Sequence, residues 1–345
     1  MGEGRRPLGG KPVSITAVAE RAGVGLGSVS RVLSGKGSVS PEMLRRVREA
    51  AESLGYQPNL LARGLRSRAT NTIGFVISDI TNPLLAAIVG GAEAVLSEAG
   101  YSVLLTNSGG RPEVDAQRIG LLLRRQVDGL IVLPASEGDP GTIAALAGAG
   151  VPVVAIDREL PGVPEASVVL SDHYTGILAA TRHLFEAGHR RVALVAGPDM
   201  RPARERLRAY SDAHARAGVP PFGFTFGPLS APRGAEAVGE LLRAAEPPTA
   251  IILGGNQLLE GAIEAAQGCG VAIGRDFALV CCDDIPLGRL HRPPIPTVMR
   301  DTDGMGRAAA RAFLARVAGE TPPPEVMATW FDSRADQDRF GAGSG

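Results

Sequence analysis

The sequence is poor in cysteine, histidine and aromatic residues, and these shortages exclude several kinds of protein. It contains three cysteines, five histidines and one tryptophan among 345 residues. Cys269, Cys281 and Cys282 lack metal-ligand spacing, as do the histidines, and adjacent cysteines rarely bridge each other. We therefore expect reduced, buried thiols, no metal site and no cofactor.

Long apolar runs are also missing. No stretch reaches the roughly 18 consecutive apolar residues that a membrane-spanning helix needs. Arg5 and Arg6 are followed by Pro, Gly and Lys instead of the apolar segment of a secretory signal. We expect a cytoplasmic protein with no membrane partner.

Catalytic motifs are absent as well. The sequence has no Walker A pattern and no G-x-S-x-G. The segment GMGRAA at 304–309 superficially fits G-x-G-x-x-A, but it lacks an acidic partner about 20 residues later. We interpret it as the start of a helix whose glycines allow close packing, and we expect that the protein is not an enzyme.

Charge is unevenly distributed along the chain. Net charge is zero, but residues 1–70 contain twelve Lys and Arg against five Asp and Glu, a difference of +7. The remainder therefore carries about −7. A basic head suits an anionic polymer such as DNA, although an ordinary solvated surface is the alternative interpretation.

Residues 14–35 predict two short helices joined by a tight turn. Apolar residues recur at i, i+3, i+4 and i+7 in the first helix: Ile15, Val18, Ala19 and Ala22. Gly23 ends this helix, because glycine adopts left-handed backbone angles without a Cβ penalty. A second helix begins near Gly25 or Leu26. The pair predicts a helix-turn-helix, whose second helix can enter the DNA major groove, and a plain helical hairpin is the alternative.

The outward face of the second helix carries Ser28, Ser30 and Arg31. Hydroxyl groups donate to phosphate oxygens, and an arginine fork pairs with guanine O6 and N7. Ser40-Pro41-Glu42 then starts a third helix, with serine as the N-cap and proline at the first helical position.

The segment after the third helix is too short to form a stable helix alone. Asn59 can cap it, and residues 60–66 allow two helical turns. Arg63 and Arg66 flank Leu65, a composition that suits a minor-groove binder with an apolar wedge. A flexible linker is the alternative interpretation.

From Thr72 onward, apolar runs alternate with helical patterns. The runs are TIGFVIS, YSVLLTN, VDGLIVLP, VPVVAID, SVVLSD, RRVALVAG, FGFTFG, TAIILGG and FALVCCDD. Such runs are typical of strands buried on both faces, with the helices as crossover connections. Two consecutive sets predict an α/β core of two doubly wound parallel-sheet subdomains with a ligand crevice between them.

The order and spacing of these motifs resemble the LacI/GalR (lactose-repressor/galactose-repressor) family of transcription regulators over Ser14 to Arg334. The motifs are ITAVAERAGV, SVSRVL, VSPE, LGYQPN, ARGLR, TIGFVISDITNP, VDGLIVLP, VPVVAIDR, AGHRRVALVAGP and the aspartate after FALVCC. The resemblance implies a homodimer that binds palindromic double-stranded operator DNA. It also implies a core like a periplasmic sugar-binding protein, whose small sugar-like effector modulates operator affinity as inducer or as corepressor.

The domain limits follow from the motifs and the resemblance together. They are a disordered tail at 1–12, a helix-turn-helix domain at 13–58, a hinge at 59–71 and an effector-binding core at 72–340. The N-subdomain covers about 72–171 and 298–328, and the C-subdomain about 172–297 and 329–340. Because no leucine heptads follow Arg334, we expect a dimer instead of a tetramer.

The resemblance places DNA contacts at Leu26, Gly27, Ser28, Ser30, Arg31 and the intercalating Leu65. Since Gly27 has no side chain and Leu26 offers only a methyl contact, Arg31 must carry more of the direct readout.

The resemblance also places effector contacts at strand ends and in the loops that follow them. The positions are Asp79, Asn82, Asp157, Arg158, Arg206, Leu229, Asn256 and Asp283. Carboxylates accept from hydroxyl pairs and arginine donates a planar fork, so the set suits a polyhydroxyl ligand. For a single residue such as Asp79, a helix cap or a turn is the alternative.

Two departures from the family pattern concern aromatic residues. Leu229 stands where relatives often stack a ring on the ligand, and Leu84 and Leu85 replace an aromatic pair. A smaller or more flexible ligand than a pyranose is one consequence, and binding without a stacked face is another. Phe222, Phe224 or Phe226 are candidate substitutes. A cytoplasmic solute-binding protein without regulatory DNA binding is the alternative function, which the basic head argues against.

Overall fold

The computed structural model describes residues 13–34, 39–56 and 69–334. The chain divides into two compact units, with the division between residues 70 and 71. The predicted tail and the hinge residues Asn59, Arg63, Leu65 and Arg66 lie outside the described residues. Within the described ranges, no helix is long and apolar enough to cross a bilayer.

The first unit is built from three short helices. They are α1 (Ile15–Ala22), α2 (Leu26–Ser34) and α3 (Pro41–Ser53). Ser40 caps the start of α3, and Gly23 ends α1 with a left-handed φ of 62°, as the sequence predicts. Val18, Val29 and Val47 come from different helices and are fully buried, so the three helices share one core.

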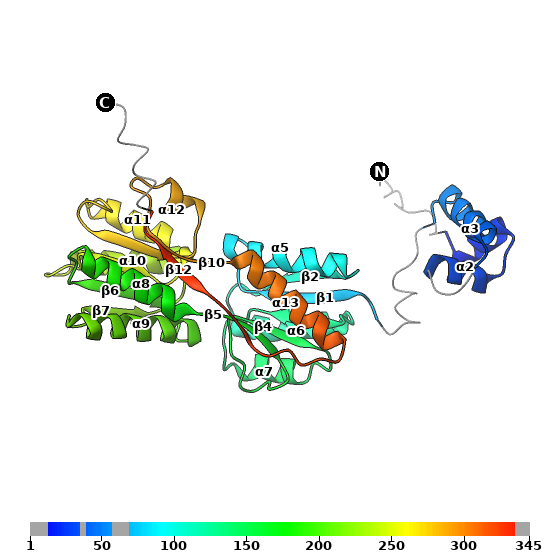
Figure 1. The fold of residues 1–345 in the computed structure, drawn as a ribbon, viewed down its shortest axis with the longest axis horizontal. Coiled ribbons are helices and arrows are strands. Elements are labelled where there is room, and N and C mark those ends of the chain that lie inside the picture. Colours follow the sequence, from blue (N-terminus) through cyan, green and yellow to red (C-terminus); the bar gives the residue numbers. More distant parts are fainter. Residues whose placement is uncertain (1–12, 35–38, 57–68, 335–345) are drawn as a thin grey trace, which may run out of the picture. The chain divides into compact units, whose positions relative to one another are not determined.

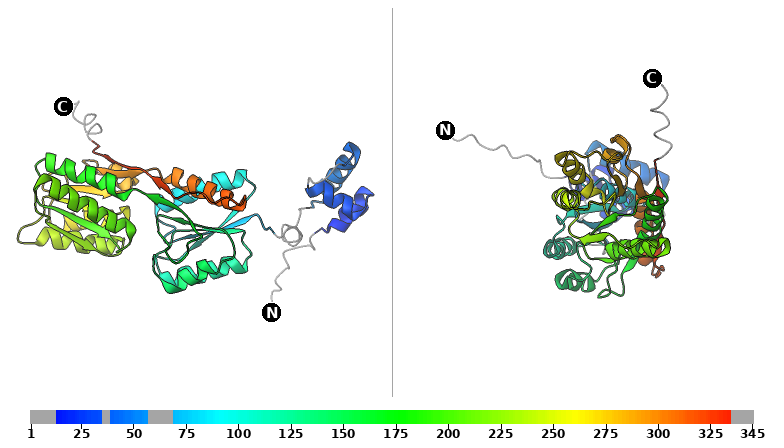
Figure 2. Two further views of the ribbon diagram at one scale, coloured as in Figure 1. Left: turned by 60° about the horizontal axis from the view of Figure 1, so that its bottom comes forward. Right: turned by 90° about the vertical axis from the view of Figure 1, so that its left-hand side faces the viewer.

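The second unit contains two six-stranded sheets (Figures 1 and 2). The first sheet has the order β11-β5-β4-β3-β1-β2, with bounds Glu325–Met327, Ser167–Ser171, Val153–Ile156, Gly129–Val132, Thr72–Ile77 and Ser102–Asn107. The second has the order β12-β10-β9-β8-β6-β7, with bounds Thr329–Asp332, Thr297–Arg300, Ala278–Cys282, Ala250–Leu253, Val192–Gly197 and Gly223–Phe226. Neighbouring strands are parallel except β12, which is antiparallel to β10. The predicted α/β fold class is confirmed.

Helices cover both sheets, and each sheet with its helices is called a lobe below. The first lobe contains α5 (Pro83–Glu98), α6 (Pro112–Arg124), α7 (Pro140–Ala147) and α13 (Thr302–Val317). The second lobe contains α8 (His173–Glu186), α9 (Arg201–Ala217), α10 (Ala231–Arg243), the 3-10 turn η1 (Asn256–Leu258), α11 (Leu259–Gly268) and α12 (Pro286–Leu290). Continuous burial along β1, β3, β4, β6 and β8 agrees with strands covered on both faces.

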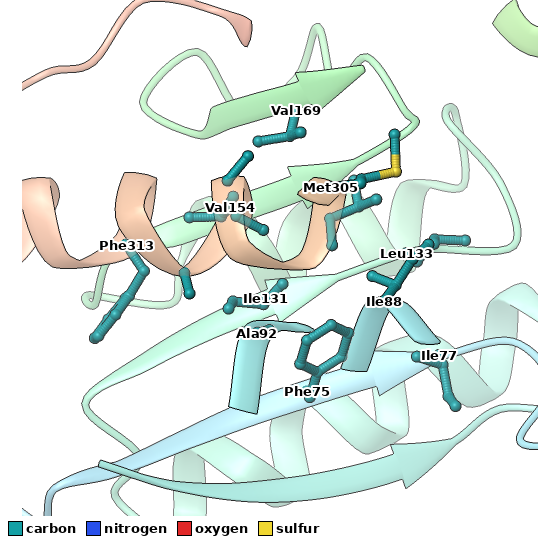
Figure 3. Packing of buried hydrophobic residues seen from close by; sticks show 14 of the residues in the cluster. Phe75, Ile77, Ile88, Ala92, Ile131, Leu133, Val154, Val169, Met305 and Phe313 are labelled. Carbon is teal, nitrogen blue, oxygen red and sulfur yellow. The ribbon is translucent and has the colours of Figure 1, made fainter. Parts of the chain in front are cut away.

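Helices α5 and α13 pack closely over one face of the first sheet. Figure 3 shows the buried side chains that they share with the strands, among them Phe75, Ile88, Ile131, Met305 and Phe313. A Cβ atom on Gly306 would lie 1.9 Å from the carbonyl oxygen of Ile88, so only glycine fits this crossing. The interpretation of segment 304–309 as part of a close-packed helix is confirmed.

The chain passes between the two lobes three times. The passages follow β5, β10 and β11, and β12 returns the chain to the second sheet. All of β10 pairs within the second sheet, so the first lobe resumes at Asp301. The predicted limits instead started this segment of the first lobe at about residue 298. These passages place the two lobes beside each other (Figure 1).

Candidate functional site

The predicted DNA-contact residues that fall within the described ranges lie on the outer side of α2. Leu26, Gly27 and Arg31 are exposed, while Ser28 and Ser30 are half-buried at the edge of the helix. The opposite side of α2 packs into the core of the first unit through its valines. A Cβ atom on Gly27 would meet nothing within 4 Å, so the protein itself leaves room there for a base or a backbone phosphate.

The predicted effector residues meet in one cavity between the two lobes. The cavity has a volume of about 900 Å³. All eight predicted residues line it: Asp79, Asn82, Asp157, Arg158, Arg206, Leu229, Asn256 and Asp283. Strands β1, β4, β6 and β9 all point their carboxyl ends toward it, which is where open parallel sheets bind ligands. Gln257 and Arg300 also line the cavity and were not predicted.

Asp157 is the most heavily hydrogen-bonded carboxylate of the cavity. Its oxygens accept from Nε2 of His173 at 2.9 Å, from the backbone of Ser171 at 3.1 Å and from Nη1 of Arg300 at 2.7 Å. Burial would raise the pKa of Asp157, but His173 and Arg300 hold that pKa well below its usual range. The carboxylate is therefore ionised near neutral pH.

His173 connects this carboxylate to an arginine of the second lobe. Nη2 of Arg206 lies 3.2 Å from Nδ1 of His173. Because arginine only donates, Nδ1 must accept, and the ring proton sits on Nε2 and faces Asp157. Burial lowers the pKa of His173 to about 4, so the ring is neutral at pH 7. The sequence carries little signal for this role, because a histidine without metal-ligand spacing does not reveal which distant groups it will contact.

Arg206 keeps one buried donor without a partner. Its Nη1 atom donates to the carbonyl oxygen of Ala196 at 3.2 Å, but its Nε atom has no hydrogen-bond partner although the residue is only 4 % exposed. A buried donor without a partner is costly, so Arg206 stabilises the fold less than a fully paired arginine would.

Amide side chains join the two lobes across the cavity. Nδ2 of Asn256 donates to Oδ1 of Asn82 at 2.9 Å, and Nε2 of Gln257 donates to Oδ2 of Asp79 at 3.1 Å. The other oxygen of Asp79 accepts from the backbone of Thr81 at 2.9 Å. Asp79 thus stabilises its own turn and also faces the cavity, so both interpretations of this residue describe part of its environment.

The apolar lining bears on the missing aromatic residues. Leu84, Leu85 and Leu229 line the cavity, and so does Phe226 of the edge strand β7. Phe222 packs against the core of the second lobe, whereas Phe224 is 51 % exposed. Of the three phenylalanines considered as substitutes, Phe226 is therefore the one with access to a ligand face.

The cysteines are free thiols in the described part of the chain. Cys281 and Cys282 are buried free thiols, and burial raises the pKa of both, whereas Cys269 is a free thiol that is only half-buried, contrary to the prediction. In the part of the chain that the structure describes, no group of three His, Cys, Asp or Glu side chains could hold a metal ion. The polar groups of the cavity are hydrogen-bonding groups suited to an organic ligand.

Two family models match separate parts of the chain. A model described as bacterial regulatory proteins, lacI family, matches residues 14–59. A model described as a periplasmic binding protein-like domain matches residues 181–329. The first covers the three helices of the first unit, and the second covers most of the second lobe.

Similar proteins match nearly the whole chain. The HTH-type transcriptional regulator CelR of Thermobifida fusca is 37 % identical over 322 residues, which cover 90 % of this chain and 94 % of that protein. The catabolite control protein A of Priestia megaterium is 30 % identical and covers 91 % of this chain and 96 % of its own length.

Solved structures show the same architecture. The lac repressor dimer bound to operator and the anti-inducer ONPF superposes with a TM-score of 0.83, at 27 % identity, covering 93 % of this chain and 98 % of that one. A complex of the regulator CelR with cellobiose matches with a TM-score of 0.69, at 33 % identity, covering 93 % and 98 %.

Proposed function

Because the chain belongs to the LacI family of bacterial regulatory proteins, and so is a helix-turn-helix transcriptional regulator, we propose that it represses transcription from a palindromic operator as a homodimer. A sugar-like effector held between the two lobes controls the affinity for that operator. Bacterial operator DNA lies in the cytoplasm, so the protein acts there. The chain catalyses no reaction, in keeping with relatives that are transcriptional regulators.

The proposed DNA contacts are made by α2. Arg31 reads a guanine in the major groove, and Ser28 and Ser30 hold the helix on the phosphate backbone. Leu26 adds an apolar contact beside Gly27. Their common location on the outer side of α2 supports this assignment. The residues proposed to enter the minor groove are Asn59, Arg63, Leu65 and Arg66.

The observation that carries the effector proposal is the convergence of all eight predicted ligand residues, from both lobes, on one cavity. Arginine donates to hydroxyl oxygens, and the carboxylates and amides of the cavity accept from and donate to hydroxyl groups. The cavity volume of about 900 Å³ accommodates a disaccharide. CelR, whose structure was solved with cellobiose, makes that disaccharide a natural first candidate.

The proposed mechanism is a shift between two arrangements of the lobes. An effector that contacts Asn82 and Asp157 in the first lobe and Arg206 and Asp283 in the second favours one arrangement over the other. Effector and operator must then alter each other's affinity by the same factor.

The test uses the full chain and a pool of randomised DNA duplexes. Repeated selection of bound duplexes should yield a palindromic sequence, and binding to it should weaken steeply as salt rises, because counterions are released from the phosphates. Cellobiose, other sugars, nucleosides and polyols are then added separately. One of these classes of compound should change the affinity of the protein for the selected DNA. If the protein binds no DNA at low salt, the solute-binding alternative is favoured. If no compound in the set changes the affinity for DNA, the effector proposal is wrong.

A further inference from the structure

Arg300 stands between two aspartates that belong to different lobes. Its Nε and Nη2 atoms donate to the two carboxylate oxygens of Asp283, over 2.6 Å and 3.1 Å. Its Nη1 atom donates to Asp157 at 2.7 Å and to Oγ of Ser171 at 2.9 Å. Asp157 follows β4 of the first sheet and Asp283 follows β9 of the second. One guanidinium group therefore binds both lobes.

The three charged side chains are almost fully buried. They are 7 % (Arg300), 7 % (Asp157) and 10 % (Asp283) exposed. Both aspartates also have left-handed backbone angles, with φ of 57° and 69°, which residues other than glycine adopt infrequently. Such a conformation persists where surrounding contacts hold it, and the fork of Arg300 supplies contacts to both.

The other arginines that line the cavity are engaged differently. Arg158 and Arg206 donate to backbone carbonyl oxygens and to a histidine ring, and not to the two carboxylates. Among the described residues, Arg300 is the cation that forms ion pairs with both Asp157 and Asp283. Burial lowers the pKa of Arg300, but the two carboxylates outweigh burial and raise it, so the group stays charged.

We propose that Arg300 is a built-in counter-cation that joins the lobes before a ligand binds and makes the cavity select uncharged sugars over amino sugars. The choice between sugars rests on the proposed function, whereas the joining of the lobes does not. With Arg300 in place, the two carboxylates already have a cation, and an ammonium group on a ligand would meet its like charge. Without it, two buried carboxylates repel each other across the cavity and attract a cation.

The first experiment measures thermal unfolding of the full chain in rising millimolar methylguanidinium. It compares the wild type with Arg300→Ala and with Arg307→Ala, a control that removes an exposed ion pair with Asp303. Arg300→Ala should unfold at a lower temperature, and methylguanidinium should restore it saturably, because it replaces the lost head group. The wild type and the control should not respond. An equal response in all three, or wild-type stability in Arg300→Ala, would overturn the proposal.

A second variant covers the case in which Arg300→Ala does not fold. Combining Arg300→Ala with Asp157→Asn and Asp283→Asn removes the buried charges together with the cation. This variant should fold and should ignore methylguanidinium, because no carboxylate remains to bind it. A saturable response in this variant would contradict the assignment.

The second experiment measures sugar affinity by calorimetry with matched pairs, glucose with glucosamine and galactose with galactosamine, and with cellobiose. The wild type should prefer the neutral sugar by at least about tenfold, Arg300→Lys should retain that preference, and Arg300→Ala should reverse it. Equal affinities in the wild type would overturn the selectivity. If the wild type binds no sugar, the proposed function fails, while the methylguanidinium result still decides whether Arg300 joins the lobes.

Discussion

Asp157 shows how single residues of the cavity depend on one another. It accepts hydrogen bonds from His173, Arg300 and the backbone of Ser171, and each of these donors comes from near a passage between the lobes. Removing one donor leaves a buried carboxylate less well satisfied, which costs more than the lost bond alone. The polar groups around Asp157 therefore form one hydrogen-bonded network.

His173 gives this network a pH dependence. Its pKa is about 4 in the folded chain against about 6.5 when unfolded, because burial disfavours the charged ring. Between these values only the unfolded chain takes up the proton, so stability present above pH 6.5 is lost as pH falls toward 4. We expect the melting temperature to fall between pH 7.5 and 4.5 and to fall less in His173→Gln.

The matched control for this measurement is His291→Gln, whose half-buried ring lies 2.7 Å from the carbonyl oxygen of Pro293 and outside the network around Asp157. That variant should keep the wild-type pH profile. The two variants should differ in their pH profiles by more than roughly 2–4 °C, the shift that about 1 kcal/mol produces in a domain of this size. Parallel profiles for His173→Gln and the wild type would contradict the role assigned to the ring.

Arg31 carries the prediction at the DNA-binding surface. Arg31→Ala should weaken binding to the selected operator by about 1–3 kcal/mol, since the proposed bidentate contact to guanine would be lost. Binding to unrelated DNA should change much less. The control is Arg45→Ala, an equally basic residue on α3 that pairs with Glu49 at the surface. Anisotropy titrations at fixed salt check this, and equal losses on both DNAs would count against base readout by Arg31.

At the scale of elements, the crossing of α5 and α13 tightly limits the size of the side chain at position 306. Gly306→Ala would place a methyl group 1.9 Å from the carbonyl oxygen of Ile88, so the helices must move apart. We expect a loss of about 1–3 kcal/mol, the usual cost of overpacking. Gly90→Ala on α5 has nothing within 4 Å and should instead stabilise by about 0.5–1 kcal/mol. Denaturant unfolding of both variants tests the opposite signs.

The elements that the sequence predicts well are the strands buried on both faces. Runs such as TIGFVIS and RRVALVAG became β1 and β6 because a continuous apolar run has few other places in a folded chain. Strands β10, β11 and β12 were not predicted. They have three or four residues each and none is buried along its whole length, so their pairing depends on the lobes around them.

The cavity was predictable to a similar extent. The eight residues inferred from the family resemblance all line it. Arg300 and Gln257 were not expected, because Arg300 ends one of the short strands and Gln257 lies in the 3-10 turn η1. Their partners come from segments far away in the sequence, and only the folded topology brings them together. Whether each of the eight contacts a ligand stays a prediction.

At the scale of the whole molecule, hydrogen bonds outside the Arg300 cluster also hold the two lobes together. Oε2 of Glu137 in the first lobe accepts from the backbone of Arg201 and from Nη2 of Arg204, both at 2.9 Å, at the start of α9 in the second lobe. Asn82 and Asn256 add a further bond. The described arrangement is therefore one in which the lobes contact each other directly.

Glu137→Ala should shift the molecule toward separated lobes. Two hydrogen bonds between the lobes are lost, one of them to a helix N-terminus, where a negative charge is favoured. We expect a larger radius of gyration in small-angle X-ray scattering and a several-fold weaker affinity for the effector that the sugar screen identifies. Glu186→Ala, which removes an exposed pair with Arg182, is the control. An unchanged radius of gyration and an unchanged affinity would show that the contacts of Glu137 do not influence the arrangement of the lobes.

The three passages between the lobes also determine what kind of motion is open to the protein. They are bonded to one another: the backbone nitrogen of Asp172 donates to the carbonyl oxygen of Met327 at 2.8 Å, Thr329 donates to the carbonyl oxygen of Asp172, and Arg300 reaches Ser171. Three passages bonded to one another in this way act as a hinge, which permits the lobes to open and twist but resists sliding of one lobe past the other. A protease nick in one passage would leave the two halves attached by the others.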